Sequence, residues 1–367
     1  MNQYYAQSMP GMEKITWLEI RARLPGAVFG QYVFAKEQNG MVVFTYDGSM
    51  ADVQELRTAE DVFLLALSDQ KVSRTRHDLQ TINEMVRKSE ALGQATNALM
   101  RFRKFSQPPT YRIISRKYGK HDYRRVDFEQ AVSDAWQKRY PRWTPVVDGG
   151  EVEIWANLLG SQLLLGFRLS DRTMRHRYQK RVELPASLRP SVAAAMVYLT
   201  EPAPGDVFLD PMCGSGTLLL ERRAAGTSAL VLGGDIVPKR VDAAYQNLVG
   251  RKKLKRHGRF AYPAITQWDA QTLPFAASSI DKIATNLPFG QQITANLHTL
   301  YPVFFAEVAR VLRPNGRAVI LSSEYDLVKE SVRQQPTLHI LTGYSMAILG
   351  RWGRIYLIEK KGGNSDE

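Results

Sequence analysis

A glycine-containing turn follows an acidic residue in the C-terminal half of the sequence. The string FLDPMCGSGT occupies residues 208–217, so Asp210 ends an expected strand, and Gly214 and Gly216 precede an expected helix. Glycines at these places let a ligand approach the backbone closely. The string lacks the GxxxxGK[ST] of a phosphate-binding loop, and Leu219 stands where GxGxxG requires a third glycine. A carboxylate would repel a pyrophosphate, so Asp210 favours a cationic group such as an amine.

Two further acidic residues each follow an expected strand. Asp235, in GGDIVPKR, lies 25 residues after Asp210. An acid at this place in a doubly wound sheet hydrogen-bonds a ribose hydroxyl, although an Asp here can also simply cap the following helix. Asp269, in QWDAQ, follows a third strand. It can accept from an adenine amino group, or it can be an ordinary turn residue.

The string TNLPFG, residues 285–290, brings two acceptors and a ring to the end of a fourth strand. The exocyclic amine of a base is a poor nucleophile because its lone pair is delocalised. The Asn286 amide oxygen and the Leu287 carbonyl, held by Pro288, can accept its two hydrogens and free that lone pair. Phe289 can stack on the base, which must be turned out of any helix to arrive. The competing interpretation is a simple Asn–Pro type turn.

The elements that position these residues alternate between strand and helix after about residue 187, which predicts a parallel sheet with crossover helices. A final pair of apolar stretches around GRWG predicts a terminal antiparallel hairpin, with a frayed tail after it. The expected strands are 207–210, 229–234, 263–267, 280–285 and 317–322, and the expected helices are 189–200, 217–225, 238–249 and 300–312.

The first half of the chain predicts mixed α and β structure. AVFGQYVFA and MVVFTY, separated by EQNG, predict a hairpin. The pattern of residues 60–100, including DVFLLAL and LQTINEMVRKSEALG, indicates helices. TYRIISR predicts a strand, VDFEQAVSDAWQKRY a helix, and VEIWANLLG and QLLLGFRL two further strands.

Positive charge is concentrated in the middle of the chain. The formal net charge is +13, and residues 101–187 hold 18 Lys and Arg against 9 Asp and Glu, whereas residues 1–100 hold 10 against 12. Aromatic residues are interleaved with this charge, as in RFRKF and YRIISRKYGKHDYRR. Cations neutralise phosphates and rings stack on unpaired bases, so a nucleic acid is the expected partner. The alternative is a solvated basic face with its rings in the core.

Composition excludes several classes of protein. The chain has 367 residues, of which 44% are hydrophobic and 23% charged, which is ordinary for a globular protein of two or three domains. No apolar run is long enough to span a membrane, and no secretory signal is recognisable. One cysteine and six histidines without metal-ligand spacing predict no disulfide and no metal site. A cytoplasmic location is expected, and a monomer is consistent with the sequence.

Several of these strings resemble those of a known family. DPMCGSGT, the later Asp235 and Asp269, and NLPFG resemble class I S-adenosylmethionine-dependent methyltransferases that act on amino groups of bases. The preceding VEIWANLLGSQLLLGFRLSD and LRPSVAAAM resemble the end of a THUMP domain and its junction in tRNA guanine-N2 methyltransferases. The resemblance implies a ferredoxin-like α+β domain at 1–65, a THUMP-like RNA-binding domain at 66–172, a linker at 173–187, and a Rossmann-like methyltransferase domain with a seven-stranded sheet at 188–361, before the tail at 362–367.

The resemblance also implies roles for residues. The target base would be held by Asn286, Leu287, Pro288 and Phe289. The cofactor S-adenosylmethionine would be held by Asp210, Cys213, Gly214, Ser215, Gly216, Thr217, Asp235, Ile236, Asp269, Ala270, Asn286 and Arg189. The partner tRNA would be bound by Arg101, Arg103, Lys104, Arg112, Arg116, Lys117, Arg172, Arg175, Arg177, Lys180 and Arg181.

The implied reaction is direct in-line transfer of a methyl group to the N2 amine of a guanosine in tRNA, without a metal or a covalent nucleophile. Three alternatives stay open. The same Asn-x-Pro-aromatic device serves an adenine-N6 methyltransferase acting on DNA or ribosomal RNA. The others are an NAD-dependent oxidoreductase, which would need the missing glycine, and a non-catalytic RNA-binding protein that keeps the cofactor fold.

Overall fold

The computed structural model describes residues 1–34, 40–171, 173–178, 180–185, 187–249, 264–288, 296–348 and 351–362. Residues 363–367 of the expected frayed tail, and Phe289 and Arg172 among the predicted site residues, lie outside these ranges. The chain divides into two compact units, Met1–Met174 and Arg175–Glu367. Within the described ranges no helix is long and apolar enough to cross a membrane.

Unit 1 is built on one sheet of eight strands in the order β2-β3-β1-β4-β8-β7-β5-β6. Neighbouring strands are antiparallel except where β5 pairs with β6 and β7. The expected hairpin is confirmed, because β2 and β3 pair antiparallel. The elements are β1 (Asn2–Ser8), α1 (Glu13–Arg23), β2 (Val28–Phe34), β3 (Gly40–Tyr46), α2 (Met50–Gln54), β4 (Asp61–Asp69), α3 (His77–Lys88), α4 (Glu90–Phe102), β5 (Thr110–Tyr118), α5 (Arg125–Arg139), β6 (Thr144–Pro145), β7 (Val152–Leu159) and β8 (Gln162–Arg168).

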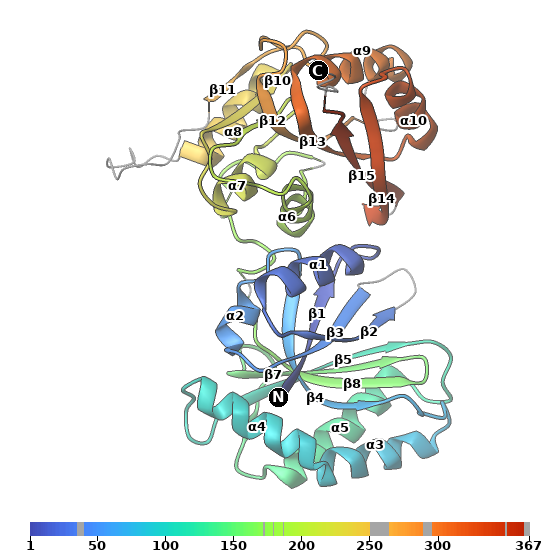
Figure 1. Cartoon of the computed structure of the whole chain (residues 1–367). Helices are drawn as coiled ribbons and strands as arrows, with labels where there is room; N and C mark the ends of the chain where they lie inside the picture. Colours follow the sequence, from blue (N-terminus) through green and yellow to red (C-terminus); the bar gives the residue numbers. More distant parts are fainter. Residues whose placement is uncertain are drawn as a thin grey trace. The chain divides into compact units, whose positions relative to one another are not determined.

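The helices α3, α4 and α5 lie together on one side of this sheet (Figure 1). They bury an apolar layer in which Trp136 and Phe128 of α5 pack with Phe167 of β8. A second apolar cluster includes Tyr5 and Phe63, whose rings stack 4.4 Å apart. Strands from both predicted N-terminal domains pair in the one sheet, and the division at residue 65 stays a prediction.

The helix expected at DVFLLAL is wrong, because these residues form β4. This strand lies in the interior of the sheet, between β1 and β8. Its apolar side chains are buried on both faces, so the run is continuous and shows neither the alternation of a half-exposed strand nor a helical period. A short apolar run of this kind is ambiguous until its partners are known.

Unit 2 contains a seven-stranded sheet in the order β11-β10-β9-β12-β13-β15-β14. The first five strands of this order run parallel, and β15 pairs antiparallel with β13 and β14. The predicted α/β sheet with an antiparallel terminal hairpin is confirmed. The elements are α6 (Pro190–Leu199), β9 (Val207–Asp210), α7 (Thr217–Ala224), β10 (Leu230–Asp235), α8 (Pro238–Val249), β11 (Ala264–Gln267), β12 (Ile280–Asn286), α9 (Leu297–Val311), β13 (Leu312–Ser322), α10 (Tyr325–Arg333), β14 (Leu338–Ile348) and β15 (Arg351–Lys360).

The order of strands reverses between β9 and β12, since the chain builds outward from β9 in one direction and then returns to add β12 on its other side (Figure 1). Ligands of open α/β sheets bind at such a switch point, outside the carboxyl ends of the strands. The core beneath it is apolar, with Phe304 and Phe305 of α9 packed with Leu209, Ile283 and other strand residues.

Three details of unit 2 differ from expectation. Helix α9 begins at Leu297, earlier than expected, because the Asn296 side chain accepts a hydrogen bond from the His298 N–H and caps it. Helix α10 was not expected, although its polar and apolar residues alternate with a helical period. Strand β13 also begins before the expected residue 317, at Leu312.

Candidate active site

The turn after β9 is held close to the neighbouring strand and helix. Gly214 and Gly216 have φ angles of +51° and +82°, a region that favours glycine. A Cβ on Gly216 would lie 2.5 Å from Leu248 Cδ1 of α8. The Cys213 N–H donates to the Gly234 carbonyl at 2.8 Å, which fastens the loop to β10. Backbone conformation therefore favours glycine at both positions, and close packing also requires it at Gly216.

Asp210 ends β9 as a buried carboxyl group. Burial raises its pKa to about 7, and the nearby Asp235 adds to the rise. The Met212 N–H, 3.3 Å from Oδ1, opposes that rise. An acidic group that is costly to ionise inside the protein is stabilised by a cationic ligand, which restores the ordinary preference for the carboxylate.

Asp235 ends β10 and ties the glycine loop to the start of α8. Its Oδ2 accepts from the Gly214 N–H at 3.2 Å, and its Oδ1 accepts from the Val237 N–H at 3.0 Å. Arg240 forms an ion pair with it at 3.4 Å. The next residue, Ile236, has a large apolar side chain that is 56% exposed. A flat ligand ring would cover it.

Trp268 is a site residue that the sequence reasoning missed. Its indole N–H donates to the Pro211 carbonyl at 3.0 Å, so it links the third strand of the site to the glycine loop. A Cβ on Gly234 would lie 2.2 Å from the Trp268 ring, so this ring fills the space that Gly234 leaves. The signal was present as a tryptophan directly before Asp269.

Asp269 forms a turn after β11. Its carboxylate accepts from the Gln271 backbone N–H at 2.9 Å and also contacts the Gln271 side-chain amide. Ala270 beside it is buried. Both interpretations of Asp269 remain compatible with this geometry, because two acceptor oxygens can serve a turn and a ligand together.

The turn after β12 presents a side-chain acceptor without a partner. Asn286 Oδ1 is buried, and no donor in the described part of the chain reaches it. The backbone around it is fixed: the Leu287 N–H donates to the Leu321 carbonyl at 3.0 Å, and the Pro288 carbonyl accepts from the Tyr301 hydroxyl at 2.9 Å. A buried, unpaired amide oxygen costs free energy that a donating ligand would recover.

These residues lie at one edge of the sheet, because β9 has β10 on one side and β12 on the other. Gly233 is in register with Asp210, and Ile283 with Leu209, so Asp235 and Asn286 end strands adjacent to Asp210. The Thr285 hydroxyl lowers the pKa of Asp210, although it makes no well-aligned hydrogen bond to a described residue. The glycine loop, Asp235 and the Asn286 turn therefore follow the carboxyl ends of three adjacent strands.

Cys213 is buried within the glycine loop. Burial raises the pKa of its thiol, and Asp210 and Asp235 raise it further. A thiol of this kind is protonated at neutral pH and is a poor nucleophile. Across the described ranges, no cluster of three or more His, Cys, Asp or Glu side chains could hold a metal ion.

Several basic residues of the linker are bonded within unit 2. Arg177 pairs with Glu221 at 3.4 Å, and the Lys180 ammonium donates to the Thr217 hydroxyl at 2.7 Å. The Arg181 side chain is exposed, while its backbone N–H is bound by Asn247. Arg175 is half-buried, and Arg189, exposed, is the N-cap residue of α6.

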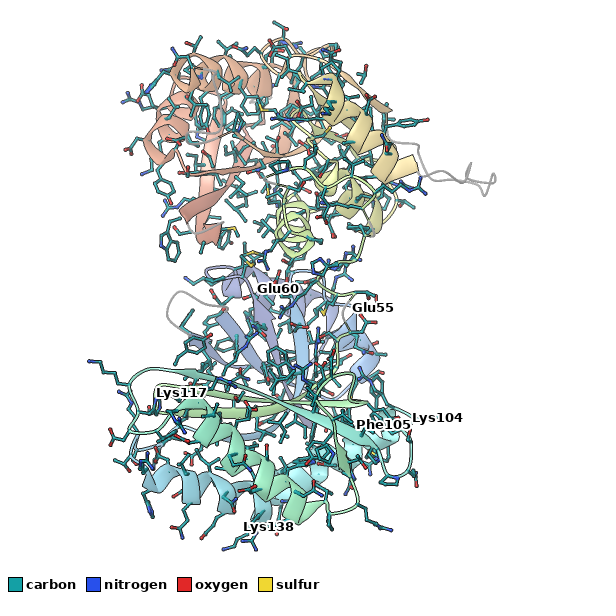
Figure 2. All side chains as sticks on the ribbon, turned by 180° about the vertical axis from the view of Figure 1, so that it is seen from behind. Glu55, Glu60, Lys104, Phe105, Lys117 and Lys138 are labelled. Atoms are coloured by element: carbon teal, nitrogen blue, oxygen red, sulfur yellow. The ribbon has the colours of Figure 1, made fainter. Side chains whose placement is uncertain are left out.

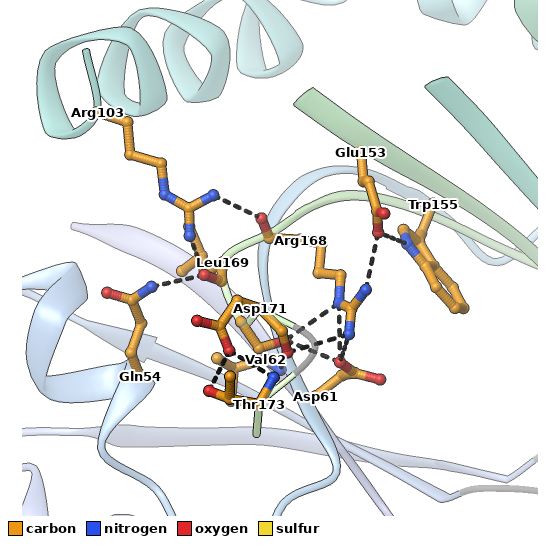
Figure 3. A network of polar contacts seen from close by, with 11 residues as sticks. Gln54, Asp61, Val62, Arg103, Glu153, Trp155, Arg168, Leu169, Asp171 and Thr173 are labelled. Carbon is orange, nitrogen blue, oxygen red and sulfur yellow. Dashed lines mark hydrogen bonds and ion pairs between the residues drawn. The ribbon is translucent and has the colours of Figure 1, made fainter. Parts of the chain in front are cut away.

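The predicted tRNA-binding residues of unit 1 do not form one free cluster. The Arg103 guanidinium donates to the carbonyls of Leu169 and Arg168, within a polar network that also contains Asp61, Glu153 and Asp171 (Figure 3). Arg112 pairs with Asp148 at 2.8 Å, and Arg116 lies 4.4 Å from the centre of the Trp155 ring.

Three further predicted residues belong to unit 1. Arg101 and Lys104 are exposed at the end of α4, and Lys117 of β5 lies 5.8 Å from the Tyr123 ring. Figure 2 shows Lys104 and Lys117 at opposite sides of unit 1. The basic residues are thus divided between the end of α4, strand β5 and the linker.

Comparison with known proteins identifies the fold of unit 2 and its relatives. Residues 177–342 match the UPF0020 family, described as an RMKL-like methyltransferase domain. The human tRNA (guanine(6)-N(2))-methyltransferase THUMP3 is 31% identical over 206 residues, which are 54% of this chain and 39% of that protein. The chain thus spans about two fifths of the length of this relative.

Relatives closer in length come from microorganisms. The tRNA (guanine(6)-N2)-methyltransferase of Thermus thermophilus is 27% identical over 68% of this chain and 72% of its own length. The protein of the same name from Archaeoglobus fulgidus is 25% identical over 88% of this chain and 83% of its own.

The crystal structure of TrmN from Thermus thermophilus has the same fold, with a TM-score of 0.76 over 98% of this chain and 100% of that one, at 23% identity. The likeness therefore includes residues of both units. Residues 177–342 therefore resemble an RMKL-like methyltransferase domain, and tRNA guanine-N2 methyltransferases are among the relatives of the chain.

Proposed function

We propose that this chain transfers a methyl group from S-adenosylmethionine to the N2 amine of a guanosine in tRNA. The observation that carries the proposal is the unpartnered amide oxygen of Asn286, at the end of the strand beside Asp210 and the glycine loop. An acceptor in this position suits an exocyclic amine. The tRNA guanine-N2 methyltransferases among the relatives support guanosine as its source.

The residues at the sheet edge fit the cofactor. Asp210 and the glycine loop would hold its methionine part, with the buried carboxyl group matched to a cation. Asp235 would bind the ribose hydroxyls, the exposed Ile236 would pack on adenine, and Asp269 with Ala270 would contact the adenine edge. When bound, S-adenosylmethionine supplies a methyl group on a positively charged sulfur.

The chain's own contribution is to orient the amine. Asn286 Oδ1 and the Leu287 carbonyl would accept its two hydrogens, and Phe289 would stack on the base. The nitrogen lone pair would then be available for the direct in-line transfer expected above. The cofactor would supply the methyl group, its sulfur would keep the electron pair of the broken bond, and the amine would release one proton to water. Most of the rate comes from placing two reactants together.

Unit 1 would supply recognition of tRNA as a THUMP-like module. The exposed Arg101 and Lys104 are suited to phosphate contacts, because no described acidic side chain pairs with them. Their positive charge agrees with the excess of Lys and Arg in residues 101–187. Residues such as Arg103, which already hold backbone carbonyls, would position this surface instead of contacting RNA.

The test combines a labelled methyl donor, unmodified tRNA transcripts, and mass spectrometry of the product nucleosides. The expected product is N2-methylguanosine. Asn286→Ala should lower kcat by about 10²–10³, by analogy with loss of one preorganised polar contact at a reacting centre. Its affinity for S-adenosylmethionine should stay within about twofold. Asn97→Ala, at an exposed position of α4, serves as the matched control.

Other products would identify the alternatives. N6-methyladenosine would replace the proposal by an adenine methyltransferase, since an Asn acceptor serves that amine equally. Calorimetric binding of NAD in place of S-adenosylmethionine would indicate the oxidoreductase. Methylation that survives Asn286→Ala unchanged would remove the central role of this turn.

A further inference from the structure

The linker that enters unit 2 is fastened to the glycine loop by one asparagine. Asn247 of α8 accepts hydrogen bonds from the backbone N–H groups of Arg181 and Val182, at 2.9 and 3.1 Å. Its amide nitrogen donates to the carbonyls of Val182 and Ser215, at 2.9 and 3.0 Å. A Ser187–Ser215 hydroxyl contact of 2.9 Å adds a second tie. The linker backbone beside Lys180 is therefore fixed with respect to the glycine loop.

This arrangement places the Lys180 ammonium at the first residue of α7. Its Nζ lies 2.7 Å from Oγ1 of Thr217, the residue that follows Gly216 and begins the helix. Thr217 is buried and Lys180 is half-buried, so the ammonium is partly withdrawn from water. The first backbone N–H groups of a helix lack intrahelical partners, and they favour a negative charge.

The charge of Lys180 has no carboxylate partner in the described part of the chain. Its ammonium bonds to the neutral Thr217 hydroxyl, while Glu221 on the same helix is paired with Arg177 at 3.4 Å. Burial lowers the pKa of Lys180, and Glu183 and Glu221 only oppose that effect. A partly buried ammonium with one neutral partner costs free energy, which an arriving anion would offset.

We propose that Lys180 binds the carboxylate of the cofactor's methionine part. The inference rests on the function proposed above and adds a linker residue to its cofactor site. S-adenosylmethionine carries two cationic groups, its ammonium and sulfonium, and a single anionic group, its carboxylate. Asp210 and Asp235 suit the cations and hydroxyls, and Lys180 is the basic side chain bonded at the opposite flank of the same loop. In this role Lys180 is a cofactor-binding residue and does not contact RNA phosphate.

The test removes the carboxylate from the ligand as well as the lysine from the protein. Calorimetry on the full chain measures affinity for S-adenosylmethionine and for decarboxylated S-adenosylmethionine, which keeps the sulfonium, the amine and the adenosine. The wild type should bind the carboxylate-bearing ligand about tenfold more tightly, as expected for one charge-assisted hydrogen bond. Lys180→Met should abolish most of that preference, and Lys180→Arg should retain part of it.

Lys329→Met is the matched control, because it removes the same kind of side chain from an exposed position of α10, outside the predicted cofactor and tRNA sites. This variant should keep the full preference. If Lys180→Met weakens both ligands equally, Lys180 is only a brace for the loop and the inference is overturned. Weaker tRNA binding with unchanged cofactor binding would also overturn it. Should the wild type bind neither ligand, the proposed function itself fails, which is a separate outcome. A wild type without preference between the ligands rejects Lys180 as a carboxylate ligand even if Lys180→Met does not fold.

Discussion

The Tyr301 hydroxyl of α9 donates a 2.9 Å hydrogen bond to the carbonyl of Pro288, two residues after Asn286. Ser322, at the end of β13, lies 2.8 Å from the same hydroxyl and accepts from the Glu324 N–H at 2.9 Å. Tyr301 is fully buried, so no water competes for these bonds. A helix and a neighbouring strand therefore hold the turn whose side chain would orient the target amine.

Tyr301→Phe should separate this positioning role from general stability. The change leaves the Pro288 carbonyl without its donor and should lower the free energy of unfolding by about 1–2 kcal/mol. We also expect kcat to fall about tenfold, because a small displacement of a catalytic group slows a positioned reaction. The KM for S-adenosylmethionine should be unchanged. Urea denaturation and initial rates measure the two effects.

Tyr356→Phe provides the comparison, since Tyr356 is also buried and its hydroxyl lies 3.5 Å from a backbone carbonyl, that of Tyr325. It should affect stability without a comparable change in kcat. An equal fall of kcat in both variants would assign the effect of Tyr301 to stability alone.

The stability of the protein without ligand should depend on pH through Asp210. Burial raises the pKa of this carboxyl group to about 7 in the folded state, whereas an unfolded Asp titrates near 3.9. Because the folded-state pKa is the higher one, the stabilisation of the folded state by the protonated Asp210 is fully present below about pH 4. It is lost progressively as the pH rises through about 7.

Asp210→Asn should therefore be more stable than the wild type at pH 8, and this advantage should disappear towards pH 4. Urea unfolding of both proteins across this range, without cofactor, measures the difference. Parallel stability curves for the two proteins would show that Asp210 does not titrate near neutrality.

Cofactor binding should carry the opposite dependence on pH. A cationic ligand favours ionised Asp210, so affinity for S-adenosylmethionine should increase between pH 6 and pH 8, with release of a proton on binding. Calorimetry in buffers of different ionisation enthalpy counts that proton. Asp210→Asn should bind more weakly and without this pH dependence. Equal proton release by both proteins would point to another titrating group.

The basic residues at the end of α4 should separate into two classes. Arg101→Gln and Lys104→Gln together should weaken tRNA binding and reduce the slope of log affinity against log salt by about one per lost phosphate contact. Arg103→Gln should instead lower the free energy of unfolding by about 1–2 kcal/mol, since two backbone carbonyls lose their donor.

Filter binding at several salt concentrations and thermal denaturation distinguish these outcomes. Lys329→Gln, at an exposed position of α10 in unit 2, is the control and should change neither measurement. A full reduction of the salt slope by Arg103→Gln alone, with stability intact, would contradict the division.

Much of unit 2 could be predicted because its signals are local. The glycine loop, Asp235 and Asn286 lie within a few residues of the strands that present them, and alternating strands and helices imply a parallel sheet. Pro190 at the start of α6 and the terminal hairpin are likewise local signals. Since parallel strands share one edge for their carboxyl ends, the convergence of these residues follows from the order of elements.

The secondary structure of unit 1 was harder to predict, because it depends on pairing between distant segments. The β4 strand reads as an uninterrupted apolar run, and only its partners β1 and β8 determine that it is a strand. Arg103 is a polar example of the same kind. Its charge is known from the sequence, but its hydrogen bond to the Leu169 carbonyl is known only from the structure. In unit 2, the contact of Trp268 with the glycine loop likewise depends on a distant partner, the Pro211 carbonyl 57 positions earlier.

The amino-acid sequence by itself determined which chemical groups are available and at which strand ends they stand, because these properties are set by residue type and local order. Only the tertiary structure decided which of those groups are already bonded. Hydrogen bonds between distant segments occupy Arg103 and the Pro288 carbonyl, whereas the Asn286 amide oxygen has no donor among the described residues. Contacts of this range cannot be deduced from neighbouring residues.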